Sequence, residues 1–207
     1  VVVIVIAIQT PYIQNIVRGK AQHYLAGKLK TKVEIGHLYV GFPHAIQLDK
    51  VYLEDRQHDT LAWVGKLRVD LDMWKLIHSE IQISSLSLDN VTAKIKRQLP
   101  DTSFNFQFIV DAFSDTAAKR PTSAADSSSW KIALNRLSLN NIRLVYNDIV
   151  TGNDMEFGIG KALIKSDTMD LNKMRFSLST VDIKNVVARV YQQKPLQTPK
   201  PVPKTRD

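Results

Sequence analysis

The sequence predicts a mostly β protein, built as one curved sheet with a single apolar face. Four stretches, 33–40, 81–88, 132–139 and 176–183, carry apolar residues at positions i, i+2, i+5 and i+7. A flat strand alternates with a period of two. Each stretch therefore slips by one residue midway, and a β-bulge at the slip would return all four apolar side chains to one face. The stretches begin 48, 51 and 44 residues apart. A strand repeat of this length is typical of an array that extends one sheet by repetition.

The apolar residues of these four stretches are predicted to line one groove or core. They are Val33, Ile35, Leu38, Val40, Ile81, Ile83, Leu86, Leu88, Ile132, Leu134, Leu137, Leu139, Phe176, Leu178, Val181 and Ile183. By alternation, the side chains of Gln82, Ser87, Ser138 and Asp182 should point away from it. The last three stretches are each followed by an asparagine at a matching position, Asn90, Asn141 and Asn185, which predicts a turn or a tight bend.

The N-terminal region predicts a membrane anchor followed by an amphipathic helix. Residues 1–10 open with eight uncharged apolar residues, too few for a span of about 20, and are interpreted as the end of a transmembrane helix. Residues 11–30 show helical periodicity. The predicted apolar side holds Tyr12, Ile13, Ile16, Val17, Tyr24, Leu25 and Leu29, and the opposite side holds Gln14, Arg18, Gln22 and Lys28. Because residues 1–32 contain no acidic residue, Arg18, Lys20 and Lys28 are expected at an anionic membrane surface. The alternative is that the helix covers the end of the sheet, so its apolar side should contact either lipid or the first strand.

The remaining chain, 31–191, is interpreted as a repeating β-groove domain, the first part of a longer array. Its segment 104–113 suits either a strand or a short buried helix. The segment 114–129 has no bulky apolar residue and predicts an insertion loop. Residues 192–207 contain four prolines, which predicts a linker or a disordered end.

Catalytic and metal-binding patterns do not emerge from the sequence. There is no cysteine, and the five histidines lack the spacing of a metal site. The net charge is +8, but the basic residues form no stripe along the repeats and no nucleic-acid-binding motif is present. We therefore predict a protein that is not an enzyme, with no cofactor, no metal and no nucleic-acid partner.

The order of segments resembles a known family. The chain reads IQTPYIQN, KLKTKVEIGHLYVGFP, LRVDLDMWKL, IQISSLSLDNVTAKIKR and DTSFNFQFIVDAFS in succession. This order resembles the N-terminal region of TamB-like proteins of the AsmA-like superfamily, in their Bacteroidota version, over about residues 1–190. The resemblance implies an inner-membrane anchor, a periplasmic β-taco with an apolar groove, and a bridge-like conduit for phospholipid to the outer membrane. It also implies a TamA-like outer-membrane barrel-assembly protein as partner.

The apolar face itself leads to a similar set of functions. A sheet with one apolar face must cover it, because each large side chain left in water costs roughly 1.5–3 kcal/mol. The sheet can close over itself, pack on another protein, or hold lipid chains. The function predicted first is a phospholipid conduit, and the alternative is a scaffold for assembly of outer-membrane proteins. Another binding module or an enzyme stays open as a third reading.

Overall fold

The structure is a computed structural model that describes residues 9–41, 44–72, 81–100, 102–118, 130–170 and 175–193. For residues 81–82, 114–118, 130–133, 168–170 and 175–176 it describes the backbone alone. The elements, in chain order, are α2 (Pro11–Leu29), β1 (Val33–Gly41), β2 (Ala45–Glu54), β3 (Thr60–Leu71), β4 (Ile81–Arg97), α4 (Gln107–Ala118), β5 (Trp130–Asp148), β6 (Asn153–Asp170) and β7 (Arg175–Gln192). The mostly β fold that the sequence predicts is confirmed.

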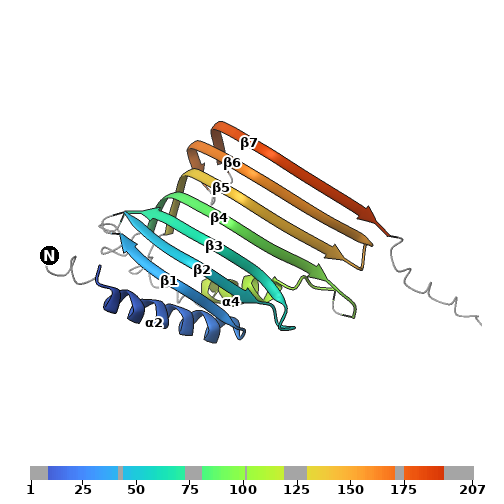
Figure 1. Cartoon of the computed structure of the whole chain (residues 1–207), viewed down its shortest axis with the longest axis horizontal. Helices are drawn as coiled ribbons and strands as arrows, with labels where there is room; N and C mark the ends of the chain where they lie inside the picture. The colour runs from blue at the N-terminus through green and yellow to red at the C-terminus, as the bar shows by residue number, and fades with distance from the viewer. Residues whose placement is uncertain are drawn as a thin grey trace, which may run out of the picture.

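The seven strands form one sheet in which chain order and spatial order coincide, from β1 at one edge to β7 at the other (Figure 1). Neighbouring strands pair antiparallel except for β4 and β5, which are parallel. A parallel pair needs a connection that returns across the sheet, and α4 lies in this connection.

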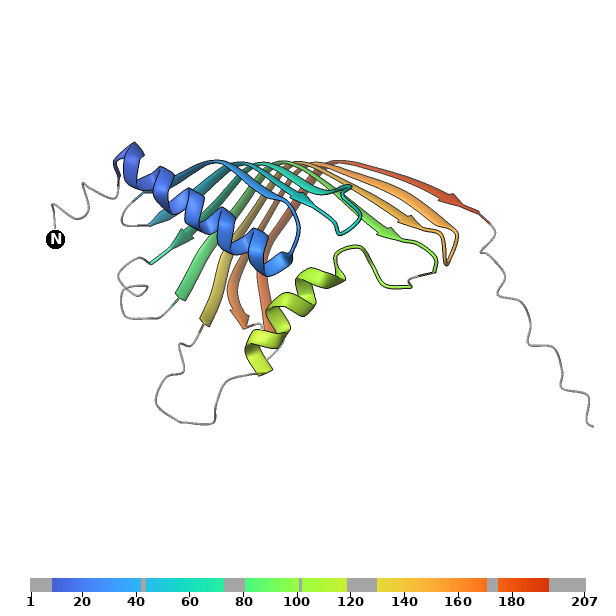
Figure 2. The ribbon, with the colours of Figure 1, turned by 90° about the horizontal axis from the view of Figure 1, so that it is seen from below.

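The sheet is strongly bent. Seen along the stacking direction, each strand rises to an apex and descends again, so that the sheet forms a trough (Figure 2). Helix α4 lies on the concave side of the trough, and α2 runs along the β1 edge (Figures 1 and 2). The two faces of the sheet are therefore a concave face, which α4 touches, and a convex face.

Residues at the two ends of α2 explain where this helix begins and ends. Thr10 precedes α2 with an extended backbone and Pro11 occupies the first turn, where a missing N–H is tolerated. The helix ends at Leu29, because Lys30 adopts a left-handed conformation with φ 54° and its N–H bonds Ala26 O at 2.8 Å. Helix α4 decides between the two readings of 104–113 in favour of a helix. It continues to Ala118, so the first five residues of the predicted loop 114–129 are helical, and residues 119–129 lie outside the described residues.

The buried core sits at the β1 end of the sheet. Leu29 of α2, Val33 of β1, Leu61 of β3 and Phe108 of α4 form one cluster, each 4–5% exposed. Partly buried residues packed around it are Leu25, Ala26, Leu53, Phe106, Ile109 and Ala112. This cluster thus joins the two helices to the first three strands.

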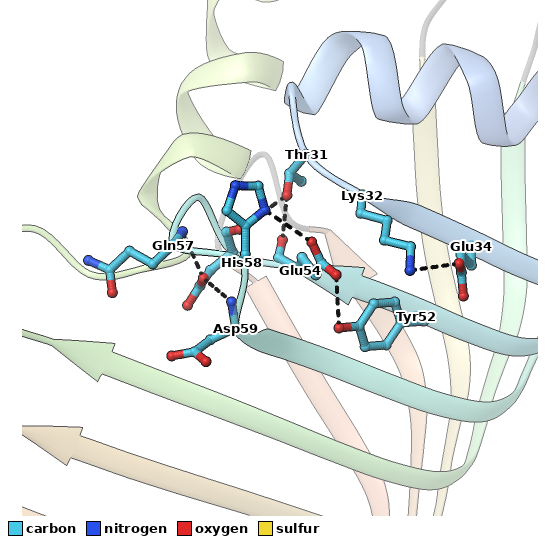
Figure 3. A network of polar contacts seen from close by, with 9 residues as sticks. Thr31, Lys32, Glu34, Tyr52, Glu54, Gln57, His58 and Asp59 are labelled. Carbon is cyan, nitrogen blue, oxygen red and sulfur yellow. Dashed lines mark hydrogen bonds and ion pairs between the residues drawn. The ribbon is translucent and has the colours of Figure 1, made fainter.

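Polar contacts fix the turn between β2 and β3 against the start of β1 (Figure 3). The Thr31 hydroxyl donates to the backbone oxygens of Glu54 and Asp55 at 3.2 and 3.1 Å. The Asp55 carboxylate is 1% exposed and accepts hydrogen bonds from the Gln57 and Asp59 amides at 2.9 and 3.0 Å. The buried Asp55 carboxylate therefore stabilises the turn by accepting hydrogen bonds from the backbone of the turn.

Candidate functional site

Four unbroken rows of apolar residues cross the whole sheet. Strand register places partners side by side, and paired residues share a face. The two rows on one side of the bend are Val40–Ile46–Val69–Leu86–Leu137–Ile164–Val181 and Leu38–Leu48–Leu67–Leu88–Leu139–Ala162–Ile183. The two on the other side are Ile35–Val51–Val64–Val91–Ile142–Ile159–Val186 and Val33–Leu53–Ala62–Ala93–Leu144–Phe157–Ala188. The rows belong to the concave face, because Val33 packs in one cluster with Phe108 of α4.

The bend lies between these two pairs of rows. A fifth row fills the gap in the register: Gly36, Lys50, Gly65, Asn90, Asn141, Gly160 and Asn185, which we call the crease. Its four non-glycine members have left-handed φ values of 52–56° inside continuous strands. One such residue breaks the pleat and returns the next side chain to the same face. The three asparagines therefore mark bends, as one of the two predicted readings had it, and none of them ends a strand.

Glycine is required in the crease by close approach. A Cβ on Gly160 would lie 2.7 Å from the Asn185 Cβ, and one on Gly65 would lie 2.9 Å from the Asn90 Cβ. Where two asparagines meet in the parallel pair, the Asn141 amide donates to Asn90 Oδ1 at 2.8 Å. The crease thus alternates residues that turn the chain with neighbours that leave room for them.

The predicted β-bulge is present in β4 and β7. Leu71 and Val69, which share a face of β3, pair with Ile83 and Leu86, so those two residues also share a face with Ser84 as the extra residue. In β7, Leu178 and Val181 pair with Ser166 and Ile164 in the same manner. Hydroxyl groups stabilise both sites: Ser84 bonds Asp70 O at 3.1 Å and Ser166 bonds Ser177 O at 3.0 Å.

The first of the four similar stretches is not equivalent to the other three, which corrects the repeat reading. Strand β1 runs antiparallel to β4, β5 and β7, so Leu38 falls in the row of Leu88 and Ile35 in the row of Val91. Its slip at Gly36 belongs to the crease and is no bulge. Val33, Ile35, Leu38 and Val40 nevertheless each fall in one of the four apolar rows, because two kinds of slip restore the same face.

Four of the residues with a predicted side-chain direction have side chains outside the described residues. The backbones of Ile81, Ile132 and Phe176 lie in β4, β5 and β7, but their side chains, like that of Gln82, lie outside the described set. Leu134 lies in β5 between Ile132 and Arg136, in the segment where the pairing with β4 is interrupted. Ser138 and Asp182 line a shallow hollow with Arg136 and Lys161, in register positions between the apolar rows, and Ser87 pairs with Arg68. These three side chains alternate with the apolar rows, as predicted.

The rows differ in how much they are covered along the groove. At the β1 end Val33, Ile35 and Leu38 are 5%, 2% and 8% exposed. In β4 and β5 the described apolar row residues are half-buried. At the β7 end Val181, Ile183 and Val186 are 55%, 48% and 58% exposed. A dry core would bury all of them alike, so the described part of the concave face is filled at one end and open toward the other.

Helix α2 lies at the β1 edge with most of its predicted apolar side turned away from the sheet. Its covered side includes Gln14, Arg18 and Gln22, whereas Tyr12, Ile16, Val17 and Tyr24 are exposed. The physical reason is that α2 covers a strand edge, whose unpaired backbone groups need polar partners. Arg18 Nη1 donates to Ile35 O at 3.0 Å, and the Ile35 N–H donates to Gln22 Oε1 at 3.2 Å. Leu25 and Leu29 at the far end of the helix pack in the core cluster that contains Val33 of β1, which is one of the two predicted contacts.

The three predicted membrane-surface residues are separated by these contacts. Arg18 is used at the β1 edge, and Lys28 lies over the rings of Tyr24 and Phe113 at 5.8 and 4.6 Å from their centroids. Lys20 is exposed. The membrane-surface role stays a prediction for Lys20 and Lys28.

A buried ion pair joins the ends of β4 and β5 at one rim of the trough. Asp148 at the end of β5 is 1% exposed and accepts hydrogen bonds from Arg97 Nε at 2.8 Å, the Thr151 hydroxyl at 2.6 Å and the Tyr146 hydroxyl at 3.0 Å. The Arg97 guanidinium, more than any other group, holds the pKa of the Asp148 carboxyl well below its usual range. A cavity of about 350 Å³ lies between this rim and the β2–β3 turn, lined by Asp55, Arg56, Gln57, Lys96, Gln98, Ser103, Phe104, Asn105, Gln107, Phe108 and Asp111.

Neither of the described helices is long and apolar enough to cross a membrane, and the predicted anchor at 1–8 lies outside the described residues. Within the same described ranges, no group of three or more acidic or histidine side chains could hold a metal ion.

Comparison with models of protein families gives a match over most of the chain. The model of the AsmA family matches residues 1–190, which include both described helices and nearly all of the sheet. No curated protein matches the chain.

Proposed function

The chain belongs to the AsmA family, and from this premise we propose that its concave face binds the acyl chains of phospholipids and carries them along the trough. The AsmA family is a non-enzymatic family associated with membrane-linked transport or assembly of lipids and proteins. The proposal makes this association specific: the cargo is phospholipid, and the surface that carries it is the four apolar rows.

The observation that carries the proposal is the continuity of those rows together with their partial exposure. Every strand contributes to all four rows, and no described row position holds a charged residue. Seven strands at about 4.8 Å spacing extend about 29 Å along the trough. One leaflet of a bilayer core is about 15 Å deep, so an acyl chain fits within the trough. Lipid tails are as apolar as the leucines that line it, so they can cover the open rows without loss of hydrogen bonds.

The wider setting follows from the resemblance of the sequence to TamB-like proteins of Bacteroidota. On this proposal the protein is held in the inner membrane by one span, with the bulk of the chain in the periplasm. The trough is the first part of a longer array that leads phospholipid toward the outer membrane. A TamA-like barrel-assembly protein is the proposed partner there.

The test is a polar substitution in the rows. Leu88 and Leu139 are direct partners in one row, so Leu88→Arg or Leu139→Asp places a charge in the path of an acyl chain, at a cost of several kcal/mol. We expect phospholipid, quantified by mass spectrometry of the purified protein, to fall to background, and outer-membrane integrity to be lost in cells at a normal protein level. Ser87→Arg is the matched control, because Ser87 alternates with the row. Full lipid content and full integrity in the Leu88 and Leu139 variants would exclude the conduit.

A second candidate function rests on the β7 edge. Among the described residues, the 18 residues of β7 pair on the β6 side alone, and the rows end there exposed. A strand of an outer-membrane protein could pair with this edge by strand addition, which is the scaffold function. The scaffold predicts a co-purifying barrel protein without stoichiometric phospholipid, whereas the conduit predicts the phospholipid itself.

A further inference from the structure

Helix α2 carries an apolar stripe that faces away from the sheet. Tyr12, Ile16, Lys20 and Tyr24 follow at intervals of four residues and so share one face of the helix. Tyr12 is 74% exposed, Tyr24 is 60% exposed and Ile16 is 41% exposed. Val17, beside them, is 40% exposed. The polar side of the same helix is already engaged with the β1 edge through Arg18 and Gln22. The exposed stripe therefore takes no part in the fold.

The charge around this stripe has one sign. Residues 9–32 contain five basic and no acidic residues. Lys32 is balanced by Glu34, whose carboxylate lies 2.9 Å from its ammonium group, but Lys20 is exposed in the middle of the stripe. Tyrosines at both ends, aliphatic residues between them and a lysine at the centre make a surface that suits the boundary between head groups and acyl chains. A protein partner would have to be acidic and apolar at once, and an anionic bilayer has this combination by composition.

We propose that α2 lies flat on an anionic bilayer surface through Tyr12, Ile16, Val17, Lys20 and Tyr24. Helix α2 runs along the β1 edge (Figures 1 and 2), and its stripe is exposed. The direction from β1 to β7 then leads away from the bilayer. The apolar rows start next to the membrane at their covered end and run outward to their open end. This orientation concerns a different surface from the rows, so it stands whether or not the rows carry lipid.

The experiment measures binding of the whole chain to vesicles of phosphatidylcholine alone and of phosphatidylcholine with about one third phosphatidylglycerol. Lys20→Glu should weaken binding to the anionic vesicles by about tenfold, and should weaken it most at low salt. Tyr24→Ser should weaken binding to both kinds of vesicle by about five- to tenfold, because it removes apolar area from the interface. Every variant keeps residues 1–8, so their contribution to binding is common to all.

Matched controls exist on the far strands. Lys165→Glu makes the same charge change at an exposed position of β6, and Tyr191→Ser removes a tyrosine that is 66% exposed on β7. Both should bind like the unaltered chain. The inference is overturned if the unaltered chain shows no preference for anionic vesicles, if the α2 variants bind within twofold of it, or if the controls lose as much.

Discussion

The two edges of the sheet differ in how far other parts of the protein cover them. Strand β1 has its backbone edge covered by α2, with Arg18 and Gln22 bonded to the main chain of Ile35, and its inner side chains buried beneath α2 and α4. Strand β7 is twice as long, 18 residues against 9, and its inner side chains are about half exposed. The same rows of residues thus begin covered and end open.

The difference shows how a repeating sheet can be terminated at one edge. Any strand edge is a template for further pairing, and a repeat array needs an end unit that differs from the repeats. Here the end unit is a helix that offers polar side chains to the edge, which is why its apolar residues face outward. The open edge has no such unit among the described residues, and it is the surface on which a further strand could add.

The largest expected effect compares two isoleucines on the rows. Ile35→Ala at the covered end should lower the free energy of unfolding by about 3 kcal/mol, because the side chain is 2% exposed and leaves a cavity. Ile183→Ala at the open end removes the same atoms from a side chain that is 48% exposed, so the loss should stay below about 1 kcal/mol. Urea unfolding of both variants measures the difference. Equal losses would show that the two ends are equally packed in solution.

A smaller effect is expected at the crease, which runs from one edge to the other. Gly160→Ala should destabilise the protein by about 2 kcal/mol, since its Cβ would lie 2.7 Å from the Asn185 Cβ and the strands must separate. Gly158→Ala, two residues away on β6, meets its nearest neighbours at 3.8 and 3.9 Å and should be neutral or slightly stabilising. Thermal unfolding of the pair decides it. A neutral Gly160→Ala would mean that the crease is more pliable than the register indicates.

The cover on β1 can be weakened directly. Arg18→Ala removes the donor to Ile35 O and should cost about 1–2 kcal/mol. Backbone amides of β1 should also exchange hydrogen faster, while those of β6 should not. Arg189→Ala removes the same charge from β7, where the side chain is 57% exposed, and should change little. If exchange in β1 stays unchanged, the helix does not protect this edge.

The smallest effect concerns acid. The folded-state pKa of Asp148 lies below its unfolded value, so its stabilisation is complete above the unfolded pKa and is lost as the pH falls toward the folded one. Between pH 7 and pH 3 the loss should be about 1 kcal/mol, because the unfolded carboxyl, with an ordinary pKa of about 3.9, takes up its proton first. Asp148→Asn should lower stability at pH 7 and flatten this acid dependence, as measured by urea unfolding at both pH values. An unchanged acid slope would assign the dependence to other carboxyl groups.

The direction of the apolar side chains could be predicted from the sequence alone. The spacing within 81–88 and 176–183 predicted a bulge that keeps Ile83 with Leu86 and Leu178 with Val181, and the register bears this out. Such a prediction is possible because side-chain direction along a strand follows from local backbone geometry. The asparagines also predicted a turn or a tight bend, since asparagine adopts the left-handed backbone conformation more readily than most residues.

Which strands pair and what covers them depend on contacts between distant segments, so they could not be predicted from local spacing. That β1 runs opposite to β4, β5 and β7 depends on pairing between distant segments, so the spacing of 33–40 looked like a repeat when its slip at Gly36 belongs to the crease. The orientation of α2 was likewise undetermined, because periodicity assumes that a helix packs its apolar side inward. Arg18 and Gln22 face the protein because the neighbour of α2 is a strand edge with unpaired backbone groups, and hydrogen bonds to those groups outweigh the burial of Tyr12 and Tyr24.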